Sequence, residues 1–190
     1  MMVGVASLAV VVYQAQLQRD QNELERRAHA ASVLPYLMIV TTINDQGVFL
    51  NLRNTGIGPA RIERVRVLHR GREVPGDAVD FYTRMRLDPN LPTDIDQLKP
   101  GRLVPAGEWI RTLGTANAAN NEQMLKELLR LFEIAELQRN MYDGYDRLAR
   151  EQGLAPREEA VLEVTYSSVF DEQWVLRSDD MVPQPVSRRP

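Results

Sequence analysis

Hydrophobic and polar positions alternate most clearly in the first third of the chain. Residues 36–43 are rich in β-branched and aromatic side chains, and residues 48–53 place alternate side chains on opposite faces of a strand. Between these two runs, residues 44–47 read Asn-Asp-Gln-Gly, a composition typical of a tight turn. The pattern therefore predicts a β-hairpin.

A further strand is predicted over residues 61–70. Its apolar face changes side between Ile62 and Val65, because these two residues are separated by an odd number of positions. An antiparallel strand absorbs one extra residue as a β-bulge. The pattern therefore predicts a bulge near Glu63 and Arg64.

Helical periodicity takes over later in the chain. Residues 120–140 carry a broad apolar arc and predict a helix that continues or restarts as far as Gln152. A shorter helix is predicted over residues 77–87 with Asp77 as its N-cap, followed by a proline-rich loop over residues 88–105. The remaining strands are predicted at residues 108–113, 160–170 and 173–177.

Together these elements predict a mainly β domain over residues 35–177. We expect an antiparallel, immunoglobulin-like β-sandwich that carries a helical insertion at residues 117–153. A mostly parallel α/β fold is disfavoured because strands and helices do not alternate along the chain. Residues 178–190 contain three prolines and are predicted to be a loose tail.

The N-terminal segment differs from the rest of the chain, because residues 1–13 carry no charge. With the next four residues they would form a helix of about 25 Å, against ~30 Å for a bilayer core. The sequence therefore predicts a membrane anchor helix over residues 1–17. A cleaved signal peptide is disfavoured because no Lys or Arg precedes the apolar run, and a soluble packing helix is the other alternative.

Residues 18–34 contain no helix breaker before Pro35 and predict a helical stalk. Leu17, Leu24 and Ala31 recur every seven residues, so a weak parallel coiled coil is an alternative to a solvated stalk.

The distribution of arginines around the anchor bears on its orientation. Arg19, Arg26 and Arg27 follow the predicted span, and no Lys or Arg precedes it. By the positive-inside rule this favours the cytoplasm for the C-terminal domain. Sandwich domains on short anchors commonly face outward, so the periplasm is the alternative.

The composition argues against several classes of function. The 190 residues include no cysteine, and the two histidines, His29 and His69, lack metal-ligand spacing, so we predict no metal site. No serine lies in a G-x-S-x-G turn and no phosphate-binding glycine loop is present, so we assign no catalytic or cofactor-binding residue and expect no cofactor. A formal net charge of −3 argues against a nucleic-acid partner.

Charge is unevenly distributed along the chain. Residues 51–86 hold eight arginines and four acids, whereas residues 115–180 hold seven basic and fourteen acidic side chains. This difference is compatible with ordinary solvated faces, or with a dipolar surface that steers a partner or a second copy of the chain.

Two groups of residues are candidates for structural or interaction roles. The turn that contains Asn54, Gly56, Gly58 and Pro59 predicts a positive φ at one of its two glycines. The apolar arc of the 120–140 helix is wider than one packing face requires. The helix is therefore either clamped between the sandwich and the 141–152 helix or part of an interface with another subunit, through Leu125, Leu129 and Phe132.

The order of these motifs resembles a group of bacterial, membrane-anchored β-sandwich proteins without an assigned function. The similarity lies in the Pro-x-Leu start at residues 35–37, the Asn-x-Gly-x-Gly-Pro-Ala turn at 54–60 and the last hairpin at 164–174. Members of the group often carry cysteine near Ser167 and Ser168, which this chain lacks. The resemblance implies a sandwich fold and a single-pass anchor in a bacterial inner membrane, and it brings no catalytic residues.

These observations favour a non-enzymatic, membrane-anchored sandwich that binds a protein partner or assembles with itself. Two alternatives remain: an envelope hydrolase with a site in the 78–105 loop region, and a soluble ligand-binding module. Fold class alone does not distinguish them.

Overall fold

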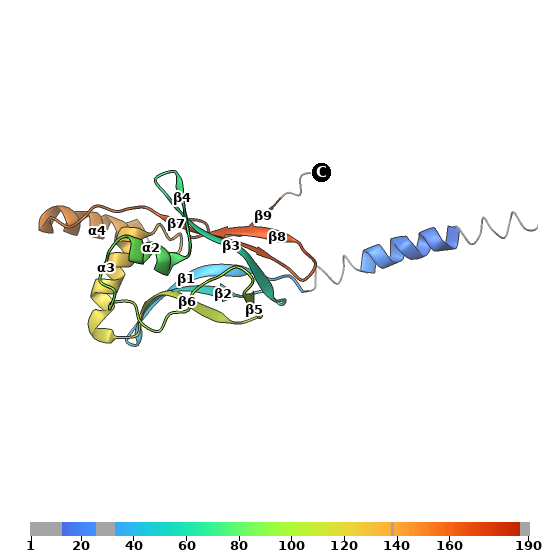
Figure 1. Cartoon of the computed structure of the whole chain (residues 1–190), viewed down its shortest axis with the longest axis horizontal. Coiled ribbons are helices and arrows are strands. Elements are labelled where there is room, and N and C mark those ends of the chain that lie inside the picture. The colour runs from blue at the N-terminus through green and yellow to red at the C-terminus, as the bar shows by residue number, and fades with distance from the viewer. Residues whose placement is uncertain (1–12, 26–32, 138, 187–190) are drawn as a thin grey trace, which may run out of the picture.

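The computed structural model describes residues 13–25, 33–137 and 139–186. Residues 13–25 are helical and exposed, and the rest forms two antiparallel sheets with the other helices gathered at one end (Figure 1). Residues 1–12 of the predicted anchor (1–17) and residues 26–32 of the predicted stalk (18–34) lie outside the described residues, whereas residues 18–25 of the stalk are helical. Within the described ranges, no helix combines the length and apolar character needed to cross a membrane.

The smaller sheet has the strand order β1-β2-β6. Strands β1 (Leu37–Asn44) and β2 (Gly47–Asn54) pair antiparallel with Asn44 opposite Gly47, which confirms the predicted hairpin. Strand β6 (Trp109–Thr115) adds to the other side of β2, and its register shifts so that Thr112 is the extra residue of a bulge.

The larger sheet has six strands. Its order is β4-β3-β7-β8-β9, and β5 also pairs with β3. In the pairing of β3 with β7, Ile62 lies opposite Tyr166 and Arg64 opposite Thr165, which leaves Glu63 as the bulged residue and confirms the predicted bulge. The strands are β3 (Ala60–His69), β4 (Arg72–Pro75), β5 (Leu103–Val104), β7 (Val161–Ser167), β8 (Gln173–Arg177) and β9 (Gln184–Pro185).

The segment predicted as a loose tail is partly ordered against this sheet. Strand β9 pairs with β8, where Val175 lies opposite Gln184, and Val186 donates a backbone hydrogen bond to Gln173. Pro185 of β9 suits an edge position, because proline supplies no N–H to a strand ladder. The prediction therefore missed a short edge strand.

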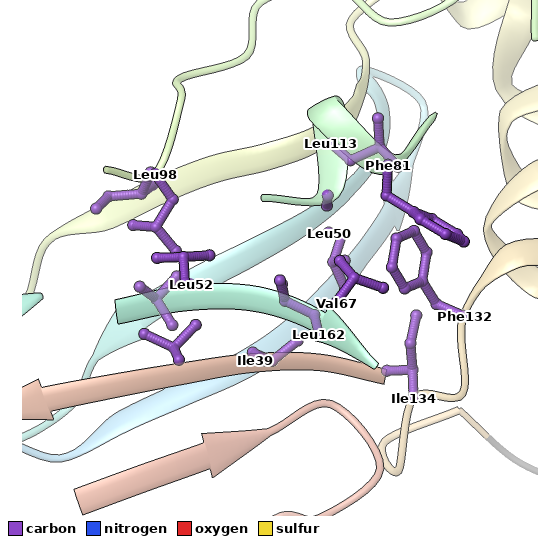
Figure 2. Close-up of a cluster of buried hydrophobic side chains, with 14 of the residues drawn as sticks. Ile39, Leu50, Leu52, Val67, Phe81, Leu98, Leu113, Phe132, Ile134 and Leu162 are labelled. Atoms are coloured by element: carbon purple, nitrogen blue, oxygen red, sulfur yellow. The ribbon is translucent and has the colours of Figure 1, made fainter. Parts of the chain in front are cut away.

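The core lies between the two sheets, where side chains from both inner faces meet (Figure 2). Leu50 on β2 and Leu113 on β6 come from the smaller sheet, and Val67 on β3 and Leu162 on β7 come from the larger one; all four are fully buried. The alternation of the strands explains this arrangement, since every second residue faces the core. The antiparallel sheets fit a β-sandwich.

Helix α2 (Ala78–Arg84) begins as predicted, with Asp77 as its N-cap. The Asp77 carboxylate accepts hydrogen bonds from the backbone N–H groups of Val79 and Asp80, and the Asp80 carboxylate accepts one from the N–H of Asp77. This reciprocal pattern satisfies N–H groups that the first helical turn leaves free. The helix ends three residues earlier than predicted.

The helical insertion between β6 and β7 differs from its prediction at one point. It consists of η1 (Ala118–Asn120), α3 (Asn121–Leu131) and α4 (Arg139–Gln152), so the predicted continuous helix over 120–140 is wrong. Phe132 has an extended backbone and a fully buried side chain that contacts Phe81 edge-on. The N–H of Glu133 then bonds to the carbonyl of Ala160, so a tertiary hydrogen bond replaces the helical one.

Candidate functional site

The outer face of the smaller sheet contains a hollow of about 920 Å³. Strands β1, β2 and β6 form its floor, and the loop at residues 92–96 forms one wall. Its lining consists of Thr42, Asn44, Gln46, Phe49, Asn51, Pro92, Thr93, Asp94, Ile95, Asp96, Trp109, Arg111 and Ala116.

Two arginine–aromatic pairs lie on this face. The Arg53 guanidinium lies 4.4 Å from the ring centroid of Trp109, and the Arg111 guanidinium lies 4.6 Å from that of Phe49. Both pairs join neighbours on β2 and β6, and their positions follow from the alternation of those strands. Arg111 also forms an ion pair with Asp94. These contacts hold the two long arginine side chains against the sheet.

The wall loop is fixed along the free edge of β6. The N–H of Thr93 donates to the carbonyl of Gly114 (2.9 Å), and the N–H of Asp96 donates to the carbonyl of Arg111 (2.8 Å). The Thr93 hydroxyl also accepts from the N–H of Ala116 (2.9 Å). The loop therefore satisfies backbone groups that an uncovered edge strand would expose.

The centre of the floor is the side chain of Asn51, which is almost fully buried. Its amide nitrogen donates to the hydroxyl oxygen of Thr42 across the β1–β2 pair (2.9 Å). Its amide oxygen accepts no hydrogen bond from the described part of the chain. The floor thus presents a fixed acceptor beside the two aromatic rings.

The loop region predicted as an alternative hydrolase site contributes two carboxylates to the hollow. Asp94 pairs with Arg111, and Asp96 lies 3.4 Å from Arg102. Residues 78–105 contain no Ser, Cys or His, and the Thr93 hydroxyl is already bonded. The hydrolase alternative for this region therefore stays a prediction.

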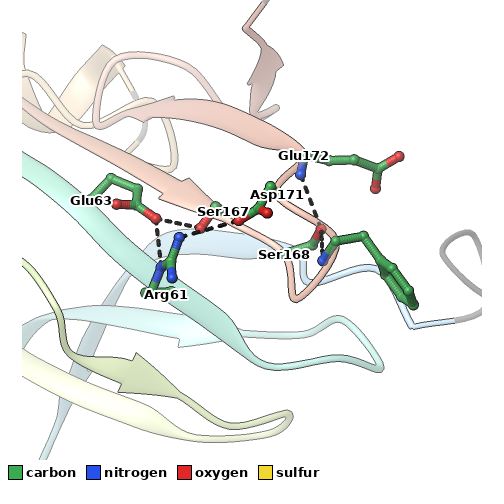
Figure 3. A network of polar contacts seen from close by, with 7 residues as sticks. Arg61, Glu63, Ser167, Ser168, Asp171 and Glu172 are labelled. Carbon is green, nitrogen blue, oxygen red and sulfur yellow. Dashed lines mark hydrogen bonds and ion pairs between the residues drawn. The ribbon is translucent and has the colours of Figure 1, made fainter.

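A serine–carboxylate contact occurs on the other sheet (Figure 3). Ser167 donates its hydroxyl hydrogen to the carboxylate of Glu63, which also accepts from Arg61 Nε (2.7 Å), and Arg61 reaches Asp171 (3.3 Å). The hydrogen bond from Ser167 and then that from Arg61 lower the pKa of Glu63 below its usual value. Because Ser167 is fully buried, no substrate can reach its hydroxyl, and the network stabilises the bulge.

His69 is also engaged in a structural contact. Its Nε2 lies 2.8 Å from the Glu158 carboxylate, which also pairs with Arg70, and its ring contacts Phe81 edge-on. No group of three or more His, Asp or Glu side chains in the described ranges is arranged to hold a metal ion.

The predicted turn is centred on Asn54, which is fully buried. Its amide oxygen accepts from the N–H groups of Tyr36 (3.2 Å) and Gly56 (3.0 Å), and its amide nitrogen donates to the carbonyls of Gly58 (2.8 Å) and Val104 (2.9 Å). The Asn54 side chain therefore connects the segment that leads into β1, the turn at residues 54–60 and strand β5.

The reason predicted for the two glycines of this turn is wrong. Neither Gly56 nor Gly58 has a positive φ. They are required because the incoming chain runs against them: a Cβ on Gly56 would overlap the backbone of Leu34, and one on Gly58 would overlap the carbonyl of Val33. Pro59 then ends the turn where β3 begins.

The residues predicted for an interface with another subunit instead pack against other parts of the same chain. Phe132 is fully buried in the core, Leu129 is 7% exposed, and Leu125 is partly buried between the core and a second apolar cluster. Helix α3 is thus clamped between the sandwich and α4, which is the intramolecular alternative. The second cluster consists of Leu129, Tyr142, Tyr145 and Ala149.

Part of the uneven charge of the sequence is paired across the larger sheet. Arg66 on β3 donates to Glu163 on β7 (2.6 Å) and to Glu73 on β4 (2.7 Å). Arg70 pairs with Glu158 (2.8 Å). Two arginines of the basic segment therefore meet carboxylates of the acidic segment, Glu163 and Glu158.

Sequence reasoning did not identify the residues of the hollow. The sequence feature that could have pointed to the hollow is the non-core face of residues 48–53, where Phe49, Asn51 and Arg53 alternate with apolar core residues. Such a face is unusual for a solvated strand because it holds an aromatic ring. The partners on β6, Trp109 and Arg111, follow the same alternation.

No protein-family model, curated protein or solved structure matches the chain. The resemblance to membrane-anchored bacterial sandwich proteins therefore stays a prediction.

Proposed function

We propose that this protein is a non-enzymatic binding domain and that the hollow on the β1-β2-β6 sheet is its recognition surface. The observation that carries the proposal is the side-by-side placement of two arginine–aromatic pairs on the outer face of the β1-β2-β6 sheet. Tryptophan, other aromatic residues and arginine are the residue types that contribute most to recognition surfaces. A volume of about 920 Å³ also lies within the roughly 300–1,000 Å³ typical of ligand sites.

We further propose that the domain is an immunoglobulin-like sandwich held at a bacterial inner membrane by residues 1–17. The uncharged run at residues 1–13 supports this. The protein should then remain in the membrane fraction after carbonate extraction, and release at alkaline pH would contradict the anchor. Protease added to intact spheroplasts should leave a cytoplasmic domain uncut, whereas digestion would place the domain in the periplasm.

Photo-crosslinking tests the recognition surface directly. A photoreactive residue is placed at Gln46, on the rim of the hollow, and a matched one at Gln173, an exposed glutamine on the other sheet. In native membranes we expect an adduct from position 46 that is lost when Trp109→Ala is added, and none from position 173. Equal adducts from both positions, or none from position 46, would contradict the proposal.

A further inference from the structure

The charges that line the hollow are already paired. Arg111 is engaged by Asp94 and by the ring of Phe49, and Asp96 lies 3.4 Å from Arg102. An anionic ligand would face two carboxylates beside one occupied guanidinium, and a cationic ligand would have to break an existing ion pair. This balance favours a neutral ligand.

The remaining polar groups of the hollow are short amides and hydroxyls. Thr42, Asn44, Gln46 and Asn51 follow one another across the β1–β2 hairpin and its turn. An amide presents a donor and an acceptor side by side, which matches two adjacent hydroxyl groups of a ligand. Asn51 offers only the acceptor of such a pair, because its amide nitrogen already donates to Thr42 and its amide oxygen alone stays available to a ligand hydroxyl.

Trp109 adds a flat apolar surface to these polar groups. Its side chain is 47% exposed although it lies in a strand, and the Arg53 guanidinium fixes the orientation of its indole. A pyranose ring has a face of C–H groups that can lie on such an indole while its hydroxyls reach neighbouring amides. Aromatic rings with a polar surround recognise ligands that are apolar on one face and polar at the edges.

The hollow is less suited to an extended peptide. A peptide that adds to a sheet needs free backbone groups on a strand edge. On the β6 side this edge is occupied by the loop at residues 92–96, through the bonds to Gly114 and Arg111. The same bonds hold the wall in place, so little conformational entropy is lost when a ligand enters.

We infer that the hollow binds a neutral oligosaccharide, with one sugar ring on Trp109 beside the amide oxygen of Asn51 and a later ring of the same oligosaccharide at Gln46, next to the β1–β2 turn. This inference rests on the proposed function, because it names the ligand class of the same surface. The volume of about 920 Å³ has room for more than one sugar ring.

Isothermal titration calorimetry on the full-length protein tests the inference. The probes are neutral hexasaccharides of glucose, mannose, xylose and N-acetylglucosamine, with a hexamer of galacturonate as the anionic comparison. We expect saturable binding of at least one neutral probe and none of the anionic one. Trp109→Ala should weaken binding about tenfold or more, and Gln46→Ala by about threefold. Trp174→Phe is the matched control and should leave binding unchanged, because Trp174 stacks on Tyr166 away from the hollow.

Three results would overturn the saccharide class: no saturable binding of any neutral probe, binding that Trp109→Ala leaves unchanged, or tighter binding of the galacturonate hexamer. The crosslinking experiment separates this failure from failure of the binding function. A protein adduct at position 46 together with no sugar binding would leave the recognition surface standing and remove the oligosaccharide. Circular dichroism of each variant verifies that the fold is retained.

Discussion

The outer faces of the two sheets hold their arginines by different contacts. On the larger sheet, Arg66 is bonded to the nearly buried carboxylate of Glu163, and Arg61 is bonded to Glu63. On the smaller sheet, Arg53 and Arg111 both lie over aromatic rings; Arg111 also pairs with Asp94, whereas Arg53 forms no ion pair with a described residue. Strand geometry is the same in both sheets, so the difference comes from the residues opposite each arginine.

This difference teaches which face is open to a ligand. A carboxylate that already accepts two or three hydrogen bonds has little left to exchange with a partner, and breaking such a pair leaves a partly buried charge. The Arg53 guanidinium has no carboxylate partner among the described residues, and its stacking on a ring contributes only about 0.5–1 kcal/mol at an exposed site. The larger sheet is therefore a closed face, and the smaller one is suited to recognition.

The largest expected loss of stability is at Asn54, which connects β2 of the smaller sheet with β5 of the larger one. Asn54→Ala removes four hydrogen bonds that connect β2, the turn and β5. The N–H groups of Tyr36 and Gly56 and the buried carbonyls of Gly58 and Val104 lose this partner. We expect the free energy of unfolding to fall by about 3 kcal/mol or more in urea denaturation. A loss below about 1 kcal/mol would show that water replaces the side chain and that the two faces are held together elsewhere.

The next largest loss of stability is expected on the outer face of the larger sheet. Glu163→Gln keeps the shape of the side chain but removes the charge that Arg66 faces at a largely buried position. We expect a loss of about 2 kcal/mol in thermal or urea unfolding and no change in crosslinking at position 46. Altered crosslinking would mean that the two faces are coupled.

Acid should weaken the same face. The pKa of Glu63 is lowered in the folded protein, so its contribution to stability is complete above the unfolded value of 4.5 and is lost as the pH falls through the lower folded value. Ser167→Ala removes the largest cause of this shift. At neutral pH we expect about 1 kcal/mol less stability, together with a smaller loss on acidification and a higher Glu63 pKa by carboxyl NMR. An unchanged Glu63 pKa would assign the shift to Arg61 alone.

The smallest expected effect is on the open face. Arg53→Ala removes the stacking on Trp109 but leaves no buried carboxylate unpaired. We expect a change in unfolding free energy of at most about 1 kcal/mol, while crosslinking at position 46 decreases because the indole loses its support. A stability loss as large as that of Glu163→Gln would contradict the comparison between the faces.

Local features of the sequence determined the strands and their irregularities. The alternation at residues 48–53 and the shift between Ile62 and Val65 predicted the hairpin and the bulge, because a strand puts successive side chains on opposite faces whatever lies around it. Asp77 likewise predicted a helix start, since its carboxylate satisfies N–H groups only one turn away. These are short-range effects that a single segment specifies.

Only the tertiary structure decided the features that depend on contacts between distant segments. Helix α3 ends at Leu131 because Phe132 enters the core beside Phe81 and Glu133 bonds to Ala160, although the apolar periodicity continues. The glycines of the turn are required by the incoming backbone near Val33, which no local rule for φ reveals.

The candidate site also depends on contacts between distant segments of the chain. The sequence showed that Phe49, Asn51 and Arg53 share a non-core face, but Trp109 and Arg111 join them only because β6 pairs with β2 across more than fifty residues. The wall of the hollow likewise depends on hydrogen bonds between the loop at residues 92–96 and β6. Residue types and alternation are local properties, whereas a hollow requires the register between strands, which the folded chain alone sets.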